Sequence, residues 1–167
     1  MFPEGGTFVE SIQNNLIFFS LDSSITGLKI FEDGMLIAQD SITHGLGASL
    51  ITPQGGKIYV AEFGGSTGQT KRISLPKAQQ NGYSIIVSGS DPIQVIVRAS
   101  NETRAQKEPL WLVVSSQSEI FYSAPFKFAE AEQVTVNLPS KDLPLGITQI
   151  TLFNLYNIIT IYRLFNS

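Results

Sequence analysis

Apolar residues along this chain come in short runs, and glycine, proline or clustered polar residues separate one run from the next. Ala48–Thr52 and Lys57–Phe63 are rich in branched and aromatic residues, with Pro53, Gly55 and Gly56 between them. Short runs bounded by turn residues predict strands. No window keeps the apolar period of about 3.6 residues that an amphipathic helix would show. The chain is therefore predicted to be all-β.

The same pattern predicts strands throughout both halves of the chain. In the first half they are Thr7–Ser11, Leu16–Leu21, Leu28–Glu32, Met35–Gln39, Ala48–Thr52, Lys57–Phe63 and Thr70–Leu75. In the second half they are Tyr83–Val87, Ile93–Arg98, Leu110–Ser115, Glu119–Phe128, Gln133–Leu138, Ile147–Phe153 and Ile158–Phe165. Asp33-Gly34 predicts a hairpin turn, because this pair readily adopts positive φ. Gly64–Gln69 is predicted to be a flexible hairpin tip.

The regular succession of predicted strands is interrupted after Leu75, where a proline precedes the polar run up to Gly82. This break predicts a linker at 76–81 between two domains, residues 1–76 and 82–167. The expected architecture is two tandem antiparallel β-sandwiches. Residues 100–109, the most polar segment, are predicted to form a mobile loop.

Hydrophobic alternation predicts which strands are buried on both faces. Val134–Leu138 alternates, which indicates one buried face and one wet face. Leu110–Val114 is apolar on both faces, so we expect a central strand with Trp111 buried in the second core. Ile158–Phe165 also fails to alternate. We expect one of its faces in the second core and the other against the first domain or a following domain.

Composition narrows the partners of this chain of 167 residues. Charged residues make up 15% and the net charge is −3, and neither half is basic, which argues against nucleic acid and anionic membrane surfaces as partners. The longest apolar run falls short of the roughly 20 residues that a spanning helix needs, so no membrane insertion is predicted. Met1–Gly6 has neither the basic nor the apolar part of a signal peptide.

The sequence offers little material for catalysis or metal binding. The absence of cysteine excludes disulfides, thiolate metal sites and a cysteine nucleophile. His44 is the only imidazole, and we expect it to hydrogen-bond locally beside Gly45. Ser66 has the spacing G-x-S-x-G within Gly64–Gly68. That run leads into a predicted strand, whereas the nucleophile elbow of a hydrolase leads into a helix. We therefore predict no catalytic residue, no cofactor and no metal ligand, and a protein that is not an enzyme.

The sequence does not favour a phosphate-binding loop, a calcium loop or a glycosidase pair. The glycines at 45–47 and 64–68 lead into strands, whereas a phosphate loop opens a helix. The turn carboxylates lack the dense spacing of a calcium loop; they are Asp22, Glu32, Asp33, Asp40 and Asp91. A glycosidase pair would need two converging carboxylates, and we expect Glu62 and Glu119, the acids within strands, to face solvent.

Several short motifs, in order, resemble the macroglobulin-like domains of large bacterial cell-envelope proteins. In the first half they are Phe2-Pro3-Glu4-Gly5-Gly6, His44-Gly45-Leu46-Gly47, Pro53-x-x-Gly56-x-x-Tyr59-x-Ala61 and Leu75-Pro76. In the second they are Leu138-Pro139, Leu143-Pro144-x-Gly146-Ile147 and Arg163-Leu164. Asn154–Ile159 departs from the resemblance, because such domains carry a more polar turn there.

The resemblance implies tandem immunoglobulin- or fibronectin-like sandwiches within a longer bacterial protein that is secreted or associated with the outer membrane. It implies a cell-envelope location, periplasmic or extracellular, and a non-catalytic role as spacer and protein-binding scaffold. Its partners would be another protein or neighbouring domains of the parent chain. The thioester of some macroglobulins needs a cysteine, so that chemistry is excluded here.

Aromatic residues are the main candidates for a binding surface. Two sets could each form a stacking platform for sugar rings or for the apolar edge of a partner: Phe121, Tyr122, Phe126 and Phe128, or Phe153, Tyr156, Tyr162 and Phe165. From these we take Phe121, Tyr122, Tyr156 and Tyr162 as the candidate binding surface. The alternative is that these side chains fill the cores. A carbohydrate-binding β-sandwich module is accordingly the second function that we consider, with an enzyme third.

Overall fold

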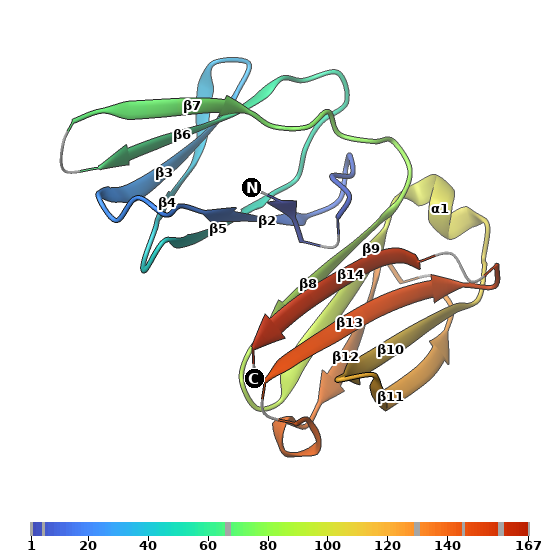
Figure 1. The fold of residues 1–167 in the computed structure, drawn as a ribbon. Coiled ribbons are helices and arrows are strands. Elements are labelled where there is room, and N and C mark those ends of the chain that lie inside the picture. Colours follow the sequence, from blue (N-terminus) through green and yellow to red (C-terminus); the bar gives the residue numbers. More distant parts are fainter. Residues whose placement is uncertain are drawn as a thin grey trace.

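The computed structural model describes residues 3–4, 6–65, 68–128, 131–144 and 146–156, together with the backbone alone of 2 and 159–166. Strands dominate it, and they fall into two groups that follow one another along the chain (Figure 1).

The first group contains two antiparallel sheets. One has the order β1-β2-β5, from β1 (Phe2–Pro3), β2 (Asn14–Phe19) and β5 (Leu46–Ile51). The other has the order β4-β3-β6-β7, from β3 (Ile25–Glu32), β4 (Met35–Ser41), β6 (Tyr59–Gly65) and β7 (Thr70–Ser74).

The second group repeats this plan. Its three-stranded sheet has the order β12-β9-β8, from β8 (Tyr83–Ser88), β9 (Ile93–Ala99) and β12 (Gln133–Leu138). Its four-stranded sheet has the order β11-β10-β13-β14, from β10 (Leu110–Ser116), β11 (Glu119–Phe126), β13 (Ile147–Asn154) and β14 (Ile159–Asn166). A short α1 (Asn101–Ala105) and a 3₁₀ turn, η1 (Ser140–Asp142), complete it.

The two groups have the same topology. Numbered from its own first strand, each places strands 1, 2 and 5 in one sheet and strands 4, 3, 6 and 7 in the other. This is the immunoglobulin-type arrangement in which the fourth strand joins the edge of the sheet that holds strands 3, 6 and 7. The predicted fold class is confirmed: the chain is all-β, with two tandem immunoglobulin- or fibronectin-like β-sandwiches.

Each sandwich encloses its own hydrophobic core. Phe18, Leu28 and Ile30 are fully buried in the first, and Leu112 and Ile150 in the second. Within the described part of the chain, no strand before Pro76 pairs with a strand after Gly82. The division into domains at 1–76 and 82–167 stays a prediction.

The predicted linker at 76–81 packs closely on the first sandwich. Ala78 is buried in the first core. Gln79 forms an isolated parallel bridge with Val9: the Gln79 N–H donates to the Phe8 carbonyl at 2.7 Å, and the Glu10 N–H donates to the Gln79 carbonyl at 2.9 Å. The first structural unit therefore extends to Gln79, three residues beyond the predicted end.

The predicted strand Thr7–Ser11 is wrong, because a side chain takes the backbone bonds that a strand would need. The Val9 N–H donates to Asn14 Oδ1 at 3.0 Å, and Asn14 Nδ2 donates to the Val9 carbonyl at 2.8 Å. Ser11 then adopts φ +61°, which ends any extended run. The first strand is instead Phe2–Pro3, which pairs with β2.

The segment 100–109 contains a helix where a mobile loop was predicted. Asn101–Ala105 forms one short turn, and the Arg104 N–H donates to the Ser100 carbonyl at 2.9 Å. Buried Thr103 ties it to the sandwich, because its Oγ1 accepts from the Gly82 N–H at 3.1 Å.

Trp111 is on the outer surface of the second sandwich, and the prediction that it is buried is wrong. Its strand, β10, does lie centrally, between β11 and β13. Leu110, Leu112 and Val114 face the core, which leaves Trp111 41% exposed on the other side. When both faces of a strand are apolar, the sequence does not show which face packs on the core.

Three predicted turns or strand pairs can be compared with the structure. Asp33 and Gly34 adopt φ +45° and +86° between β3 and β4, which confirms the predicted turn. The tip at Gly64–Gln69 is only partly described, since 66 and 67 lie outside the described residues. The last two predicted strands correspond to β13 and β14, which pair with each other. The predicted burial of the two faces of β14 concerns side chains outside the described residues.

Candidate binding surfaces

The junction between the two sandwiches is a direct contact. Tyr83 and Ile85 of β8 face the second core, so Ser84 and Ile86 point the other way. Ser84 Oγ donates to the Gln13 carbonyl of the first sandwich at 2.8 Å, and Ile86 is only 6% exposed although it lies outside the second core cluster. β2 lies beside β8. The outer face of β8 is thus covered by the first sandwich.

The candidate aromatic residues lie in different places on the second sandwich. Phe121 is 39% exposed on β11, whereas its neighbour Tyr122 is partly buried against the second core. Tyr156 is 73% exposed in the turn after β13. The side chain of Tyr162 lies outside the described residues.

Strand register separates the two exposed members of that set. Tyr122, next to Phe121, is opposite Val114 of β10, and Asn154, two residues before Tyr156, is opposite Leu110. With a rise of about 3.3 Å per residue, Phe121 and Tyr156 are on the order of 15 Å apart along the strand direction. One sugar ring cannot stack on both.

A row of two aromatic residues and a proline crosses the outer face of this sheet. Pro125, Trp111 and Phe153 are cross-strand partners on β11, β10 and β13, so their side chains lie on one face. Beside them is a shallow hollow of about 330 Å³. It is lined by Trp111, Val113, Phe153, Asn154 and Leu155. Sequence reasoning missed this surface because it assigned Trp111 to the core.

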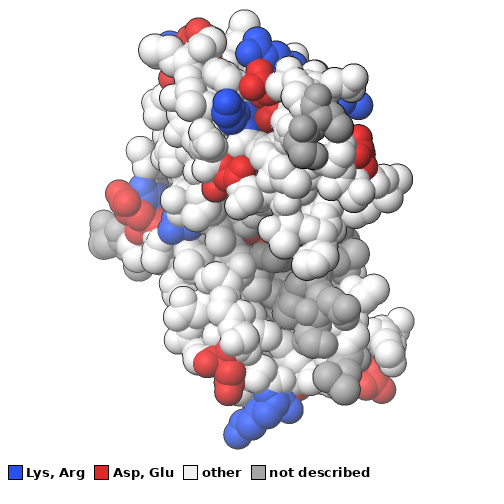
Figure 2. Space-filling model, turned by 90° about the vertical axis from the view of Figure 1, so that its left-hand side faces the viewer, with Lys and Arg blue, Asp and Glu red and all other residues white. Residues whose placement is uncertain are grey.

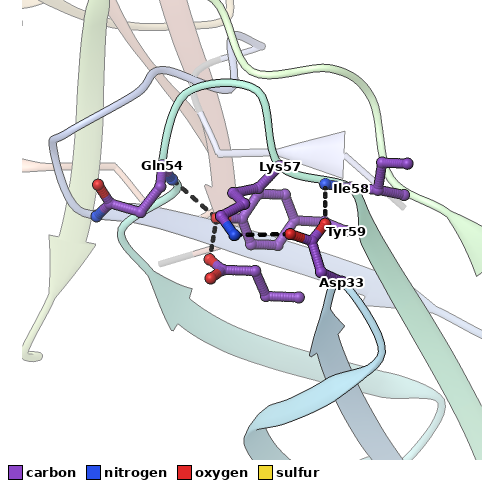
Figure 3. Close-up of polar contacts among 6 residues, drawn as sticks. Asp33, Gln54, Lys57, Ile58 and Tyr59 are labelled. Carbon is purple, nitrogen blue, oxygen red and sulfur yellow. Dashed lines mark hydrogen bonds and ion pairs between the residues drawn. The ribbon is translucent and has the colours of Figure 1, made fainter.

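Ionisable residues of the first sandwich gather where the β3–β4 turn meets the loop before β6 (Figure 3). Lys57 Nζ is 2.7 Å from Asp33 Oδ2, and the Ile58 N–H donates to Asp33 Oδ1 at 3.0 Å. The hydrogen bond from Lys57, followed by that from the Ile58 amide, lowers the pKa of Asp33. The same bond to Asp33 raises the pKa of Lys57.

Tyr59 completes this cluster from the start of β6. Its hydroxyl donates to Glu32 and accepts from the Gln54 N–H at 2.8 Å (Figure 3). Burial, with the added effect of the bond to Glu32, raises the pKa of Tyr59. A tyrosine hydroxyl that bonds to backbone a few residues upstream is the tyrosine corner of immunoglobulin-type sandwiches. The cluster fastens a loop to a hairpin.

Glu62 and Glu119, expected to face solvent, differ in exposure. Glu119 is exposed at the start of β11. The Glu62 side chain is 13% exposed, because Arg72 Nε donates to its Oε2 at 2.7 Å. Arg72 also lies over the ring of Phe31, 5.2 Å from its centroid. Glu62 therefore belongs to a cross-strand structural contact.

His44 occupies a tight turn. The Thr43 and Leu46 backbones exchange hydrogen bonds of 2.8 and 3.0 Å across His44 and Gly45, whose φ angles are +51° and +77°. The imidazole is exposed and forms no hydrogen bond with the described residues, so the predicted local bond of the ring is wrong. Gly45 is required by space, because a Cβ there would lie 2.4 Å from the Ser20 carbonyl oxygen.

Charge is sparse on the molecular surface seen in Figure 2, where uncharged residues cover most of the described area. Among the described residues, no group of three or more His, Cys, Asp or Glu side chains is placed to hold a metal ion. No helix in the described part of the chain has the length and apolarity that a membrane span requires.

Comparison with known proteins found likeness only among solved structures. No family model matches the sequence, and no curated protein matches it. The solved structure of fibronectin(III)-like modules of Clostridium thermocellum CbhA is similar over 96% of this chain and 87% of that chain, with 12% identity and a TM-score of 0.32. A TM-score this low defines no shared arrangement, so the fold assignment rests on strand order and register.

Proposed function

We propose that this chain is a non-catalytic structural and binding segment, in which two β-sandwiches are held at a set angle and present their outer faces to partners. The observation that carries the proposal is the junction. Ser84 bonds to the first sandwich, Ile86 is buried on the same face of β8, and the connection at Gln79 is tied to residues 8–10. A contact of this kind suits a spacer, because it restricts how the two units can swing.

The ionisable residues described above support the non-catalytic part of the proposal. Asp33 pairs with Lys57, Glu62 pairs with Arg72, and Tyr59 bonds to Glu32 and a backbone amide. Each of these groups fastens one strand or loop to another. Their role in the proposal is to hold edges and loops in place.

The last part of the proposal concerns the larger protein to which this segment would belong. We propose a large bacterial cell-envelope protein with macroglobulin-like domains, on the support of the sequence motifs alone. The flanking gene sequence tests this proposal: it should encode a signal peptide and further β-sandwich domains.

Small-angle X-ray scattering tests the spacer role. We expect one rigid arrangement to fit the wild-type profile. Ile86→Glu would place a charge in the junction, and we expect it to enlarge the radius of gyration and to require an ensemble of arrangements. Ile120→Glu is the matched control, since Ile120 is 67% exposed on β11. A wild-type chain that itself needs an ensemble, or an Ile86→Glu profile identical to wild type, contradicts the proposal.

Carbohydrate binding is the second candidate, and the row Pro125–Trp111–Phe153 favours it. Sugar rings stack on exposed aromatic faces, and the hollow beside the row includes the polar Asn154. Trp111 is the only tryptophan in the chain, so its fluorescence reports directly on this surface. Titration with cellohexaose should shift the emission if sugars bind there. Binding by calorimetry that is lost in Trp111→Ala and kept in Phe121→Ala would support this function, and an unchanged emission at millimolar sugar would exclude cellohexaose as a ligand.

A further inference from the structure

Asn81 and Gly82 connect the two sandwiches, and this is the one place in the chain where glycine follows asparagine. Asn81 is exposed at the end of the connection, and Gly82 directly precedes β8. An asparagine side chain can react with the backbone nitrogen of the next residue, and glycine hinders that approach least because it has no side chain. By sequence, Asn81 is therefore the asparagine most open to this reaction.

The fold requires glycine at position 82. Gly82 adopts φ +152°, which other residues rarely do. A Cβ here would also lie 3.0 Å from Cγ2 of Val9 in the first sandwich. Among the described residues, the side chain of Asn81 is held only by a long hydrogen bond, in which Ser100 Oγ donates to its Oδ1 at 3.5 Å. The glycine is thus fixed in place, whereas the asparagine side chain is loosely held.

The nitrogen that would attack is held by two hydroxyl groups. The Gly82 N–H donates to Thr103 Oγ1 at 3.1 Å and to Ser100 Oγ at 3.3 Å. These hydroxyls bond to each other at 2.8 Å, and both residues are buried. The Gly82 carbonyl accepts from the Ser100 N–H at 3.0 Å. Gly82 is therefore bonded on both sides by the segment that contains α1.

The reaction needs this nitrogen to be free. The Gly82 N–H must give its proton to water or hydroxide, and the nitrogen must form a bond to Cγ of Asn81. The bond from Cγ to Nδ2 then breaks, and Nδ2 takes a proton from water and leaves as ammonia. Water opens the cyclic imide at either carbonyl, which gives aspartate or isoaspartate. While the N–H bonds to two acceptors, loss of its proton and movement toward Cγ are both opposed.

We propose that Asn81 is a site of self-deamidation whose rate is set by the hydroxyl groups of Ser100 and Thr103. The reaction proceeds when residues 100–103 move away from Gly82, in a local opening of the fold. This inference goes beyond the proposed spacer role, because it concerns a covalent change at the connection between the sandwiches.

The product would place a negative charge where the two sandwiches meet. Asn81 lines a pocket of about 270 Å³ together with Glu10 of the first sandwich and Glu102 of α1. None of the described residues that line this pocket is a lysine, arginine or histidine. Three carboxylates would then share one pocket, and their repulsion would oppose the contact. Because ammonia is lost, deamidation would loosen the contact in one direction only.

Mass spectrometry of the full chain measures the rate. Trypsin releases residues 78–98 as one peptide whose only asparagine is Asn81, and deamidation exchanges the NH₂ of that side chain for OH. During incubation at mildly alkaline pH, we expect the folded chain to react at least tenfold more slowly than the chain unfolded in guanidinium chloride. Asn101, which is exposed and followed by Glu102, is the internal control and should stay unmodified over the same period.

Three variants test the role of the hydroxyl groups. Thr103→Val keeps the shape of the side chain and removes one acceptor, so it should speed deamidation about threefold to tenfold, the factor expected for one hydrogen bond. Thr103→Ser keeps the hydroxyl and should react as slowly as wild type. Thr148→Val, the same change at a buried threonine of β13, is the matched control and should leave the rate unchanged. Circular dichroism shows that each variant is folded.

Equal rates in the folded and the unfolded chain, or in Thr103→Val and Thr148→Val, would overturn the proposal. So would the absence of deamidation at Asn81 in the unfolded chain. Scattering tests the effect on the contact: Asn81→Asp should enlarge the radius of gyration, and Asn137→Asp, at an exposed position on β12, should not. A profile of Asn81→Asp identical to wild type would overturn the loosening. A wild-type chain that is itself flexible removes the spacer role, and the rates still decide the deamidation site.

Discussion

Tyr59 and Thr148 occupy the same place in the two sandwiches but differ in how their hydroxyl groups are bonded. Tyr59 is opposite Glu32, the last residue of β3 before a two-residue hairpin turn. The register of β10 with β13, continued by one residue, sets Thr148 opposite Ser116, the last residue of β10 before an equivalent turn. The Tyr59 hydroxyl has two partners, whereas Thr148 Oγ1 is buried without one.

Tyr59→Phe should destabilise the first sandwich by about 1–3 kcal/mol, because it keeps the ring and leaves the Gln54 N–H and Glu32 without their partner. Urea unfolding followed by circular dichroism measures this change. Tyr156→Phe is the control, since Tyr156 is 73% exposed. Equal stability of the two variants would mean that the corner contributes nothing.

Thr148→Val should have the opposite sign. The substitution keeps the shape of the side chain and removes a buried hydroxyl that has no partner, so we expect stabilisation of up to about 1 kcal/mol. Thr103→Val is the matched control and should destabilise, because Thr103 Oγ1 accepts from the Gly82 N–H. A loss of stability in Thr148→Val would show that the hydroxyl is bonded in solution.

The Asp33–Lys57 pair should make stability depend on pH in a defined window. Asp33 has a pKa below 3.8 in the folded chain, so its contribution is present above pH 3.8 and is lost as the pH falls through the folded-state value. Lys57 has a pKa above 10.5, so its contribution is lost only as the pH rises through that higher value. The melting-temperature difference between wild type and Asp33→Asn should be constant near neutral pH and shrink in acid. A difference that is the same at pH 2 and pH 7 would contradict this assignment.

The two separate cores predict that residues 80–167 fold without the first sandwich. A fragment of this length should unfold cooperatively in urea and give a dispersed NMR spectrum. Its exposed Ile86 should lower its solubility, which Ile86→Ser would restore. A fragment that lacks cooperative unfolding would show that the domains are one folding unit.

Much of the fold could be predicted because period-2 alternation and turn residues are local signals. Runs such as Gln133–Leu138 were placed to the residue. The failures have non-local causes. The backbone of Val9 is bonded by Asn14 and flanked by bonds to Gln79, and no pattern in Thr7–Ser11 shows this. The sequence did not show that Trp111 and Val113 are on the outer face of their strand, because both faces of that strand are apolar.

The binding surfaces were harder to predict than the fold. Aromatic content identified Phe121 and Tyr156 as candidates, but register sets them far apart. The pair Asn81 and Gly82 is visible in the sequence, but the two hydroxyl groups that hold Gly82 come from 18 and 21 residues later in the chain. Only the pairing of β8 with β9 brings Ser100 and Thr103 to Gly82.

The bridge between Val9 and Gln79 also bears on how this segment would carry mechanical load. The two strands of the bridge are parallel, so a pull on the chain from before Phe8 and from after Gln79 acts on them in opposite directions. The two backbone hydrogen bonds at Gln79 would be loaded together, in shear, before tension reached the strands enclosed between them. The strands β2 to β7, which lie between the two ends of the bridge, would then form a closed loop beside the line of force. The bridge would shield them from a pull applied at Phe8 and Gln79 until its two hydrogen bonds broke.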